Sequence, residues 1–278
     1  MNKLVSIIVP CYNQAHFMGD ALQSVLNQTY STWECIIVND GSPDDTKVEA
    51  SKWCDKDNRF IYLDKSNGGL SSARNAGIAI CKGEYILPLD ADDMIHESFL
   101  STLVPELNND DSLAIASCYS KFFFGTIENI VHELKPVGTT YHALLFENSL
   151  IATSLYRKKC WEEVGGYDEN MKNGFEDWEF WLAITKLGWT YKVVENFLFF
   201  YRKQKQSMLI DTLQNHRISN MKYVFKKHKD VYLKHHDNTI DYLMYLLKKN
   251  EEGALKLKKS IPYKIAKILA KPLNLFKK

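Results

Sequence analysis

The residues best suited to chemistry are two aspartates at the end of a hydrophobic run, Asp90 and Asp92, with Ala91 between them. Carboxylate oxygens are the ligands that Mg²⁺ and Mn²⁺ prefer, and Mg²⁺ keeps open positions that substrate phosphates fill. Carboxylates spaced i, i+2 at a strand end can share one metal ion and a neighbouring hydroxyl. The alternative is a solvated turn in which Asp93 caps a following helix.

Two further polar residues stand where a nucleotide could bind. Asp40 ends a hydrophobic run and precedes Gly41-Ser42. It could accept hydrogen bonds from a nucleobase or ribose, or belong to an ordinary turn. Arg74 lies on a predicted helix after a Gly-Gly loop, where it could reach a diphosphate or be a surface charge.

A second acidic pair, Glu176-Asp177, lies at the predicted start of an aromatic-rich helix. Acidic residues stabilise the first helical turn through the macrodipole, so a structural explanation is open. A carboxylate here could also act as a general base toward an acceptor hydroxyl. The nearby Trp178, Phe180 and Trp181 could stack on a sugar or form core, and core is favoured for Trp181.

Hydrophobic periodicity predicts the elements that must position these residues. Strands are expected at 5–9, 34–38, 59–63 and 84–89, and helices at 15–28, 44–54 and 71–81. Such alternation indicates βαβ units and a largely parallel sheet, whose ligands bind beyond the carboxyl ends of the strands. Polar groups that follow three of these strands, at 12–13, 40–42 and 90–93, are therefore predicted to converge on one crevice.

The pattern is less regular after residue 111. Strands are expected at 112–124 and 151–156, helices at 158–164 and 176–187, and two strands within 189–200. From residue 211 onward the chain is predicted to be helical.

Composition bounds the class of protein. The chain has 278 residues, 45% hydrophobic and 25% charged, which excludes wholesale disorder and collagen-like structure. The net charge of +1 hides a division, because residues 1–214 hold 19 Lys+Arg against 29 Asp+Glu, and residues 215–278 hold 16 against 5. Six cysteines without CxxC or zinc spacing indicate buried free thiols in a reducing cytosol. With no signal peptide or membrane span expected, a cytoplasmic location is predicted.

Seven short motifs in order resemble those of family 2 glycosyltransferases with the GT-A fold. They are VSIIVPCYN, SVLNQTY, CIIVNDGSPDDT, NGGLSSARNAGI, GEYILPLDADD, VGGYDE and NGFEDWEFW, and the resemblance covers residues 3–208, ending near FFYR. It implies an α/β GT-A fold, a Rossmann-like mixed sheet flanked by helices. The catalytic domain would span 1–210, and a helical basic C-terminal extension 211–278.

The resemblance also implies roles for individual residues. The nucleotide-sugar-binding positions would be Pro10, Tyr12, Asn13, Asp40, Asn67, Arg74, Asp90, Ala91, Glu176 and Arg202. Asp90 would meet the ribose or a metal-bound water, and Asp92 would ligate Mn²⁺ or Mg²⁺ bridging the diphosphate, with Asp90 as a second ligand. Asp177 would be the catalytic base, giving inversion at the anomeric carbon.

One segment departs from the family pattern. Many relatives carry a histidine after the last strand, which can help to hold metal or diphosphate, but Tyr201–Ser207 contains none. Arg202 or Lys203 could neutralise phosphate instead, or phosphates and water could complete a metal site with one carboxylate.

The basic tail has the pattern of an interfacial helix. Residues 256–278 contain eight lysines and neither arginine nor acid. An apolar side that includes Ile261, Ile265 and Leu269 runs on to Phe276, with a kink expected at Pro272. Contact with an anionic membrane is expected, and packing of the helix on the body is the alternative. Nucleic-acid binding is disfavoured because the tail has no arginine and no known motif.

These observations favour an inverting, metal-dependent hexosyltransferase. It would move a sugar from a nucleotide sugar, foremost a UDP-sugar, to a glycan or lipid-linked oligosaccharide in surface polysaccharide synthesis, at the cytosolic face of the inner membrane. A catalytically inactive nucleotide-sugar or glycan-binding module is the alternative, disfavoured because Asp92 and Asp177 are both present. A nucleotidyltransferase should carry a Gly-rich basic loop after the first strand, where this chain has CYNQAHF.

Overall fold

The structure, a computed structural model, describes residues 3–269. The chain divides into two compact units, with the boundary between Lys227 and His228. The first unit carries all the strands described below, and the second consists of helices. Each unit is described by itself.

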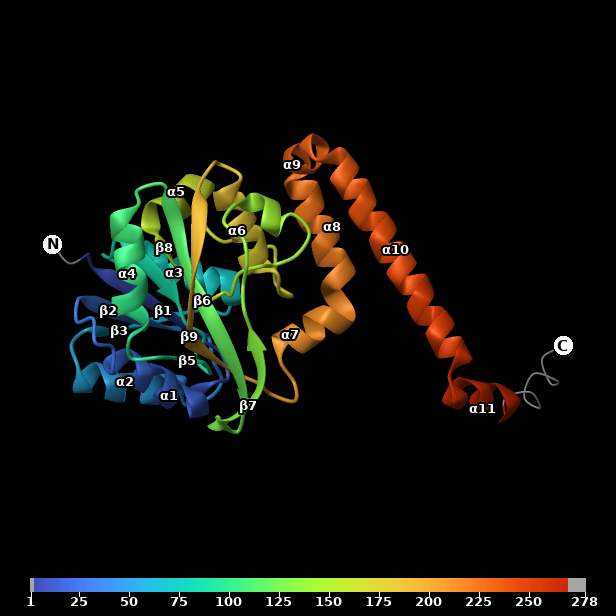
Figure 1. Cartoon of the computed structure of the whole chain (residues 1–278). Coiled ribbons are helices and arrows are strands. Elements are labelled where there is room, and N and C mark those ends of the chain that lie inside the picture. Colours follow the sequence, from blue (N-terminus) through green and yellow to red (C-terminus); the bar gives the residue numbers. More distant parts are fainter. Residues whose placement is uncertain (1–2, 270–278) are drawn as a thin grey trace. The chain divides into compact units, whose positions relative to one another are not determined.

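A mixed sheet, nine-stranded within the described residues, forms the centre of the first unit (Figure 1). Its strands are β1 (Val5–Cys11), β2 (Trp33–Asp40), β3 (Phe60–Lys65), β4 (Tyr85–Pro88), β5 (Met94–Ile95), β6 (Leu113–Phe124), β7 (Thr126–Leu134), β8 (Leu155–Arg157) and β9 (Thr190–Arg202). Their order is β3-β2-β1-β4-β8-β6-β9-β5, and β7 pairs with β6. Strands β1 to β4 are mutually parallel, whereas β8 is antiparallel to both β4 and β6.

Helices cover both faces of this sheet. The helices of the first unit are α1 (Ala15–Leu26), α2 (Thr46–Lys56), α3 (Leu70–Ile80), α4 (Phe99–Asn109), α5 (Lys158–Val164), α6 (Glu176–Thr185), α7 (Met208–Asp211) and α8 (Arg217–Lys227), with short 3₁₀ and π segments η1 (Tyr141–Leu144) and η2 (Thr212–His216). All seven residues of β1 are buried, as expected for a parallel strand packed on both sides. The predicted α/β GT-A class, with a Rossmann-like mixed sheet flanked by helices, is confirmed.

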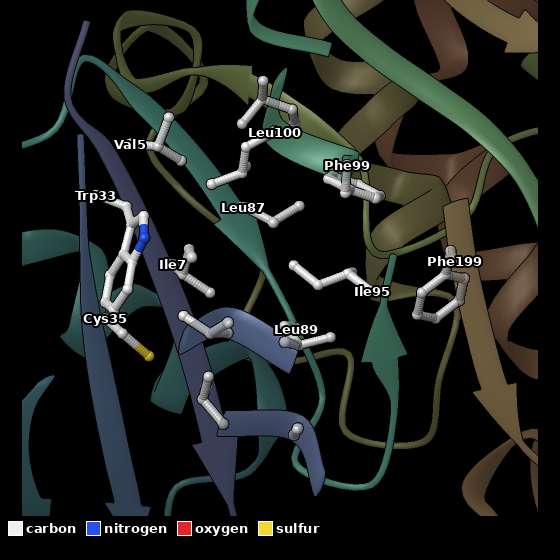
Figure 2. Close-up of a cluster of buried hydrophobic side chains, with 14 of the residues drawn as sticks. Val5, Ile7, Trp33, Cys35, Leu87, Leu89, Ile95, Phe99, Leu100 and Phe199 are labelled. Atoms are coloured by element: carbon white, nitrogen blue, oxygen red, sulfur yellow. The ribbon is translucent and has the colours of Figure 1, made fainter. Parts of the chain in front are cut away.

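The larger core lies on the face covered by α1, α2 and α4. Figure 2 shows side chains of β1, β2 and β4 meeting those of α4 and β9. Val5 and Ile7 of β1, Leu87 of β4 and Phe99 of α4 are fully buried here. Burial of apolar surface on this scale is the main force that fixes the strand ends, and so the site at those ends.

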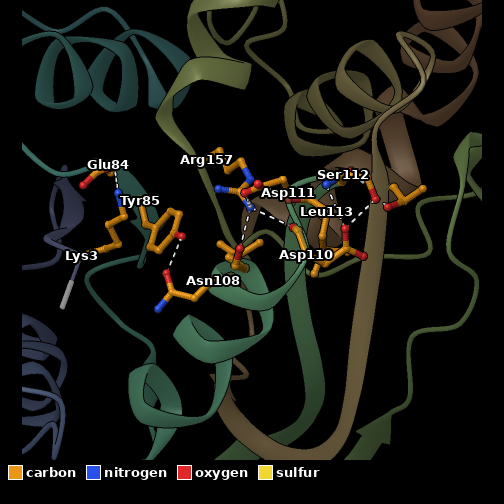
Figure 3. A network of polar contacts seen from close by, with 11 residues as sticks. Lys3, Glu84, Tyr85, Asn108, Asp110, Asp111, Ser112, Leu113 and Arg157 are labelled. Atoms are coloured by element: carbon orange, nitrogen blue, oxygen red, sulfur yellow. Dashed lines mark hydrogen bonds and ion pairs between the residues drawn. The ribbon is translucent and has the colours of Figure 1, made fainter. Parts of the chain in front are cut away.

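An arginine network anchors the sheet at the amino end of β4 (Figure 3). Arg157 of β8 donates hydrogen bonds to the carbonyls of Leu107 (2.5 Å), Asp110 (2.9 Å) and Leu113 (2.8 Å). The first two carbonyls lie at the C-terminal end of α4 and its cap, a place where arginine is favourable. Arg157 thereby joins α4 and β6 to the short strand between β4 and β6.

The sequence predictions differ from the structure in three places. The two strands expected within 189–200 are one strand, β9, whose pairing with β6 shifts register beside Tyr119. The strand expected at 151–156 covers only Leu155–Arg157. Strands β5 and β7 were not expected, and every residue of β7 is exposed, so no apolar alternation marks it. The helical stretch expected after Asp93 is α4, which begins only at Phe99, so Asp93 does not cap it; the Oδ1 of Asp93 instead accepts the Arg202 amide at 2.8 Å.

The second unit comprises α9 (Lys229–Lys234), α10 (His236–Lys259) and α11 (Ile261–Leu269). In α11 the apolar residues Ile261 and Leu269 are 72% and 70% exposed. No helix within residues 3–269 is both long and apolar enough to cross a membrane. The predicted continuation through Pro272 to Phe276 lies outside the described residues.

All six cysteines are free, and five of them are buried. Cys54 is the half-buried exception. Cys11 ends β1, is 1% exposed and lies 3.3 Å from the Thr46 hydroxyl. Burial raises the pKa of the Cys11 thiol.

Candidate active site

A pocket of about 360 Å³ opens beyond the carboxyl ends of β1, β2 and β4. Seven of the sequence-predicted site residues line it: Pro10, Tyr12, Asp40, Asn67, Asp90, Ala91 and Asp92. The three polar groups expected to converge each contribute at least one residue. Register explains this, because Pro10 pairs with Val38 and Ile8 pairs with Pro88 in parallel strands that end at the same edge.

Asp40 organises one wall of the pocket. Its buried carboxylate accepts hydrogen bonds from the amides of Gly68 (3.0 Å) and Gly69 (2.8 Å) and pairs with Lys65 at 2.5 Å. Gly69 has φ of +88°, in the region that favours glycine. Asp40 therefore fixes the loop that begins α3.

Asn13 lies outside the pocket lining and ties two loops together. It has φ of +57°, and its backbone amide donates to the Ser42 hydroxyl at 2.7 Å. This contact joins the end of β1 to the turn that follows β2.

Arg74 of α3 bridges the two acidic motifs from a buried position, being 1% exposed. Its guanidinium donates to Asp90 at 2.8 Å and to Glu176 at 2.8 Å. Burial lowers the pKa of Arg74, but the charges of Asp90 and Glu176 outweigh that effect and raise it. Arg74 does not line the pocket, so the structure gives it a bridging position behind Asp90.

Asp92 lines the pocket together with Asp90. Gln204, after β9, donates to its Oδ2 at 2.6 Å. Burial, followed by the charge of Asp90, raises the pKa of Asp92 to about 6. Burial, followed by the charges of Asp92 and Asp90, raises the pKa of the neighbouring Asp93 well above its usual range.

Arg202 faces away from the pocket. Its side chain donates to the Asp92 carbonyl (2.9 Å), the Gly125 carbonyl (3.2 Å) and the Asp20 carboxylate (2.7 Å). Gln204 is the residue of this segment whose side chain donates to the Asp92 carboxylate, while the Arg202 backbone amide donates to Oδ1 of Asp93 at 2.8 Å.

The residues at the strand end fit a divalent cation. Within residues 3–269 no group of three His, Cys, Asp or Glu side chains could enclose one. Asp90 and Asp92 nevertheless supply two carboxylates at the pocket wall. A site with two carboxylates and open positions suits Mg²⁺ or Mn²⁺ that also binds phosphate oxygens and water.

Asp177 lies in the first turn of α6, outside the lining of this pocket. Its Oδ1 accepts the Trp178 amide at 2.8 Å, and its Oδ2 accepts the side-chain amide of Asn148 at 2.7 Å. Burial and then the charge of Glu176 raise the pKa of Asp177, Arg74 lowers it, and the result is about 7. A carboxylate with such a pKa is a stronger base than an ordinary aspartate near neutral pH.

A tight turn sets the direction in which α6 begins. Phe175 has φ of +65° and Gly174 has φ of +84°. A side chain on Gly174 would collide with Thr212, whose hydroxyl donates to the Asn173 carbonyl at 2.8 Å. Asn220 of α8 donates to the Gly174 carbonyl at 2.9 Å. Segments after β9 therefore hold this turn in place.

The aromatic residues of α6 are core. Trp178 is 2% exposed, and Phe180 and Trp181 are fully buried. Phe180 stacks on Tyr167 with 4.0 Å between ring centroids. The sugar-stacking alternative therefore does not apply to these three side chains.

Sequence reasoning did not assign several polar residues of the pocket, among them Gln14, Lys172, Gln204, Gln206 and Ser207. Lys172 is the one cationic side chain in this lining within the described chain. Gln204 occupies the segment already marked by its missing histidine, so a signal existed. Gln14 and Lys172 lie at a helix start and in an aperiodic loop, where no pattern marks them.

Comparisons with known proteins agree with this geometry. Residues 6–165 match the family model described as Glycosyl transferase family 2. An uncharacterized glycosyltransferase of Rickettsia typhi is 33% identical over 202 residues, which cover 68% of this chain and 61% of that protein. The chain spans 21% to 61% of the length of the first curated relatives that it matches.

Solved structures show the same fold at low sequence identity. S. aureus TarS in complex with UDP-GlcNAc aligns with a TM-score of 0.63 at 20% identity, covering 75% of this chain and 60% of that chain. The mannosyltransferase PcManGT from Pyrobaculum calidifontis, in complex with GDP-Man and Mn²⁺, aligns with a TM-score of 0.64 at 18% identity, covering 100% and 82%. With its sheet, its strand-end pocket and the match over more than half of its length, this chain belongs to the family 2 glycosyltransferases.

Proposed function

We propose that this chain is an inverting, metal-dependent glycosyltransferase that transfers a hexosyl group from a UDP-sugar to a glycan or lipid-linked acceptor. The observation that carries the proposal is the pairing of two acidic motifs across Arg74, one in the pocket at Asp90 and one beside Asp177. Such a pairing suits a reaction with separate donor and acceptor sides.

The donor would occupy the strand-end pocket. The nucleobase and ribose would lie against Pro10, Tyr12, Asp40 and Asn67, which line the wall formed by β1, β2 and the loop before α3. The complexes of related folds with UDP-GlcNAc and with GDP-Man support a nucleotide-sugar donor. We choose uridine because the TarS complex contains it.

Asp92, with Asp90, would hold Mn²⁺ or Mg²⁺ at the diphosphate. When bound, the cation would offset the negative charge that develops on the departing nucleoside diphosphate. Lys172, exposed at the pocket lining, would add a second positive charge on the same side.

Asp177 would act on the acceptor. Its carboxylate would take the proton of an acceptor hydroxyl while the hydroxyl oxygen attacks the anomeric carbon. The bond between that carbon and the diphosphate oxygen would break on the opposite face, so the configuration would invert. Since the pKa of Asp177 is about 7, activity should fall as the pH drops below that value and the base becomes protonated.

The decisive experiment compares Asp177→Asn with the wild type. The variant should lose sugar transfer by a factor of 10² or more and still bind UDP with Mn²⁺ in calorimetry. Asp55→Asn, at an exposed position on α2, is the matched control and should keep both properties. Transfer by Asp177→Asn at the wild-type rate would remove the base from the proposal. Binding without turnover by the wild type, across a panel of nucleotide sugars and glycan acceptors, would favour the inactive module.

We also propose a cytoplasmic protein that contacts the inner membrane peripherally. The helix α11 exposes Ile261, Ile265 and Leu269 and carries Lys264 and Lys267. Apolar and basic residues on one helix are the features that bind anionic lipid surfaces. A lipid-linked acceptor would be presented at such a surface.

A further inference from the structure

The two carboxylate oxygens of Asp177 have partners of different origin. Oδ1 accepts the amide of the next residue, Trp178, which belongs to the same helix. Oδ2 accepts Nδ2 of Asn148, which lies 29 positions earlier, in the segment after η1. The second contact therefore depends on how the segment that contains Asn148 packs against α6.

The segment around Asn148 is anchored on both sides. The Trp178 indole donates to the Leu144 carbonyl at 2.6 Å, and Leu144 and Leu150 are buried. The Ser149 hydroxyl donates to the Ala143 carbonyl at 2.7 Å. An exposed asparagine between such anchors keeps its position relative to α6.

The orientation of the Asn148 amide follows from its own contacts. Its Oδ1 accepts the Leu150 backbone amide at 3.3 Å. The NH₂ group must then be the end that faces Asp177, because the opposite orientation would set a carbonyl oxygen against a carboxylate. Asn148 is thus a fixed donor to the anion.

Several charged or titratable groups surround Asp177, but none of them donates a hydrogen bond to Oδ2. Glu176, beside it on α6, raises its pKa, and Arg74 of α3 lowers it. Tyr167, packed against α6, is buried, and Lys227 of α8 pairs with Glu179 and Asp168. His142, on η1, contacts Thr140. The direct donor to Oδ2 is Asn148.

We propose that Asn148 is the positioning residue of the general base: it holds the Asp177 carboxylate in the rotation that accepts the acceptor proton. The inference rests on the function proposed for Asp177. The terminal torsion of aspartate is broad, so a carboxylate without this donor would rotate more freely. A hydrogen bond to the charged form also favours that form, so Asn148 keeps the base deprotonated to lower pH.

Asn148→Ala tests the proposal through the pH profile of transfer. We expect kcat to fall about 10–100-fold, as for a misplaced catalytic group, with the KM for the donor changed less than twofold. The acidic limb of the kcat/KM profile should move upward by about one pH unit, the order of effect of one hydrogen bond to a charged group. A purely structural contact would leave that limb in place.

Two variants at the same position and one elsewhere sharpen the result. Asn148→Gln keeps the amide and should recover part of kcat and of the wild-type limb. Asn148→Asp sets a like charge beside Asp177 and should move the limb further than alanine does. Asn108→Ala removes another exposed asparagine, whose Oδ1 accepts the Tyr85 hydroxyl at 2.8 Å near the amino end of β4, and should behave as the wild type (Figure 3).

The outcomes separate this inference from the proposed function. If Asp177→Asn abolishes transfer but Asn148→Ala keeps the wild-type limb and kcat, Asn148 does not position the base. A lower kcat in Asn148→Ala with an unmoved limb also overturns the inference, because it indicates a structural or acceptor contact. If Asp177→Asn retains transfer, the base assignment itself fails.

Discussion

The guanidinium of Arg74 lies 2.8 Å from the carboxylate of Glu176, although 102 positions separate them in the chain. The second terminal nitrogen of the same guanidinium donates to Asp90, also at 2.8 Å. One buried cation thus holds the start of α6 against the end of β4. Arg74 therefore links the strand-end pocket to the helix that carries Asp177.

Replacing Arg74 with lysine should separate the effect of the positive charge from that of the planar guanidinium geometry. Lysine keeps the positive charge but cannot offer two nitrogens in a fixed plane, so one carboxylate loses its partner. The free energy of unfolding should fall by about 3–5 kcal/mol, the effect of breaking a buried ion pair, and transfer should fall by more than tenfold. Urea denaturation and initial rates measure the two effects. Unchanged stability would mean that water or another group satisfies Glu176.

Gly77 should tolerate no side chain. A Cβ there would lie 2.7 Å from Cγ2 of Ile8 and 2.9 Å from Cγ2 of Val38, so α3 could not keep its distance from the sheet. Gly77→Ala should destabilise the protein by about 1–3 kcal/mol. Gly19→Ala, in α1, is the control, because its Cβ would find only Glu49 at 4.0 Å and alanine favours a helix by about 0.5–1 kcal/mol. Thermal melts of both variants give the comparison, and equal melting temperatures would contradict this account.

Asp92→Asn should uncouple nucleotide binding from the metal. The substitution removes one of the two carboxylates proposed to hold the cation and leaves the wall at Asp40 intact. Calorimetry should show Mn²⁺ strengthening UDP binding at least tenfold in the wild type and less than threefold in the variant, since each tenfold step is about 1.4 kcal/mol. An equal Mn²⁺ effect in both proteins would place the cation elsewhere.

The pKa of Asp177 predicts how stability depends on pH. Its value of about 7 in the folded protein lies above the ordinary 3.8, so the folded state binds this proton more tightly. The resulting stabilisation is complete below about pH 4 and is lost as the pH rises through 7. Asp177→Asn should therefore melt higher than the wild type at pH 8, by about 2–4 °C, and the difference should shrink toward pH 5. A variant that melts lower at pH 8 would contradict the raised pKa.

The lysines of α11 should govern membrane binding. Lys264→Glu with Lys267→Glu reverses two charges and should reduce sedimentation with vesicles of anionic phospholipid by at least tenfold, at about 1 kcal/mol per basic residue removed. Lys47→Glu with Lys52→Glu, on α2 of the first unit, is the matched control. Full binding by the α11 variant, or equal binding to neutral vesicles, would argue that no anionic surface is recognised.

Much of the fold was predictable because its signals are local. Buried parallel strands such as β1 and β2 are continuous apolar runs, and the polar residues at their ends mark the pocket in advance. Strand β7 was missed because all of its residues are exposed, which removes the apolar alternation that marks a strand.

The site was predictable only in part, because some of its contacts join distant segments. Asp90, Asp92 and Asp177 stand in motifs with their own local signature. Gln204 and Asn148 meet those aspartates through tertiary packing, at sequence separations of 112 and 29. The missing histidine marked the segment of Gln204 but not the residue, and nothing in the sequence marked Asn148. The resemblance placed Arg202 at the phosphates. In the structure its guanidinium pairs instead with Asp20 of α1, which lies 182 positions earlier in the chain.

The burial of the thiols has a practical consequence for chemical labelling. Cys11 lines the strand-end pocket, yet it is 1% exposed and the pKa of its thiol is raised, so little reactive thiolate forms near neutral pH. Maleimides should react first at Cys54, the half-buried thiol on α2. The native sequence therefore offers one preferred attachment point for a fluorophore, without engineering of the other five cysteines.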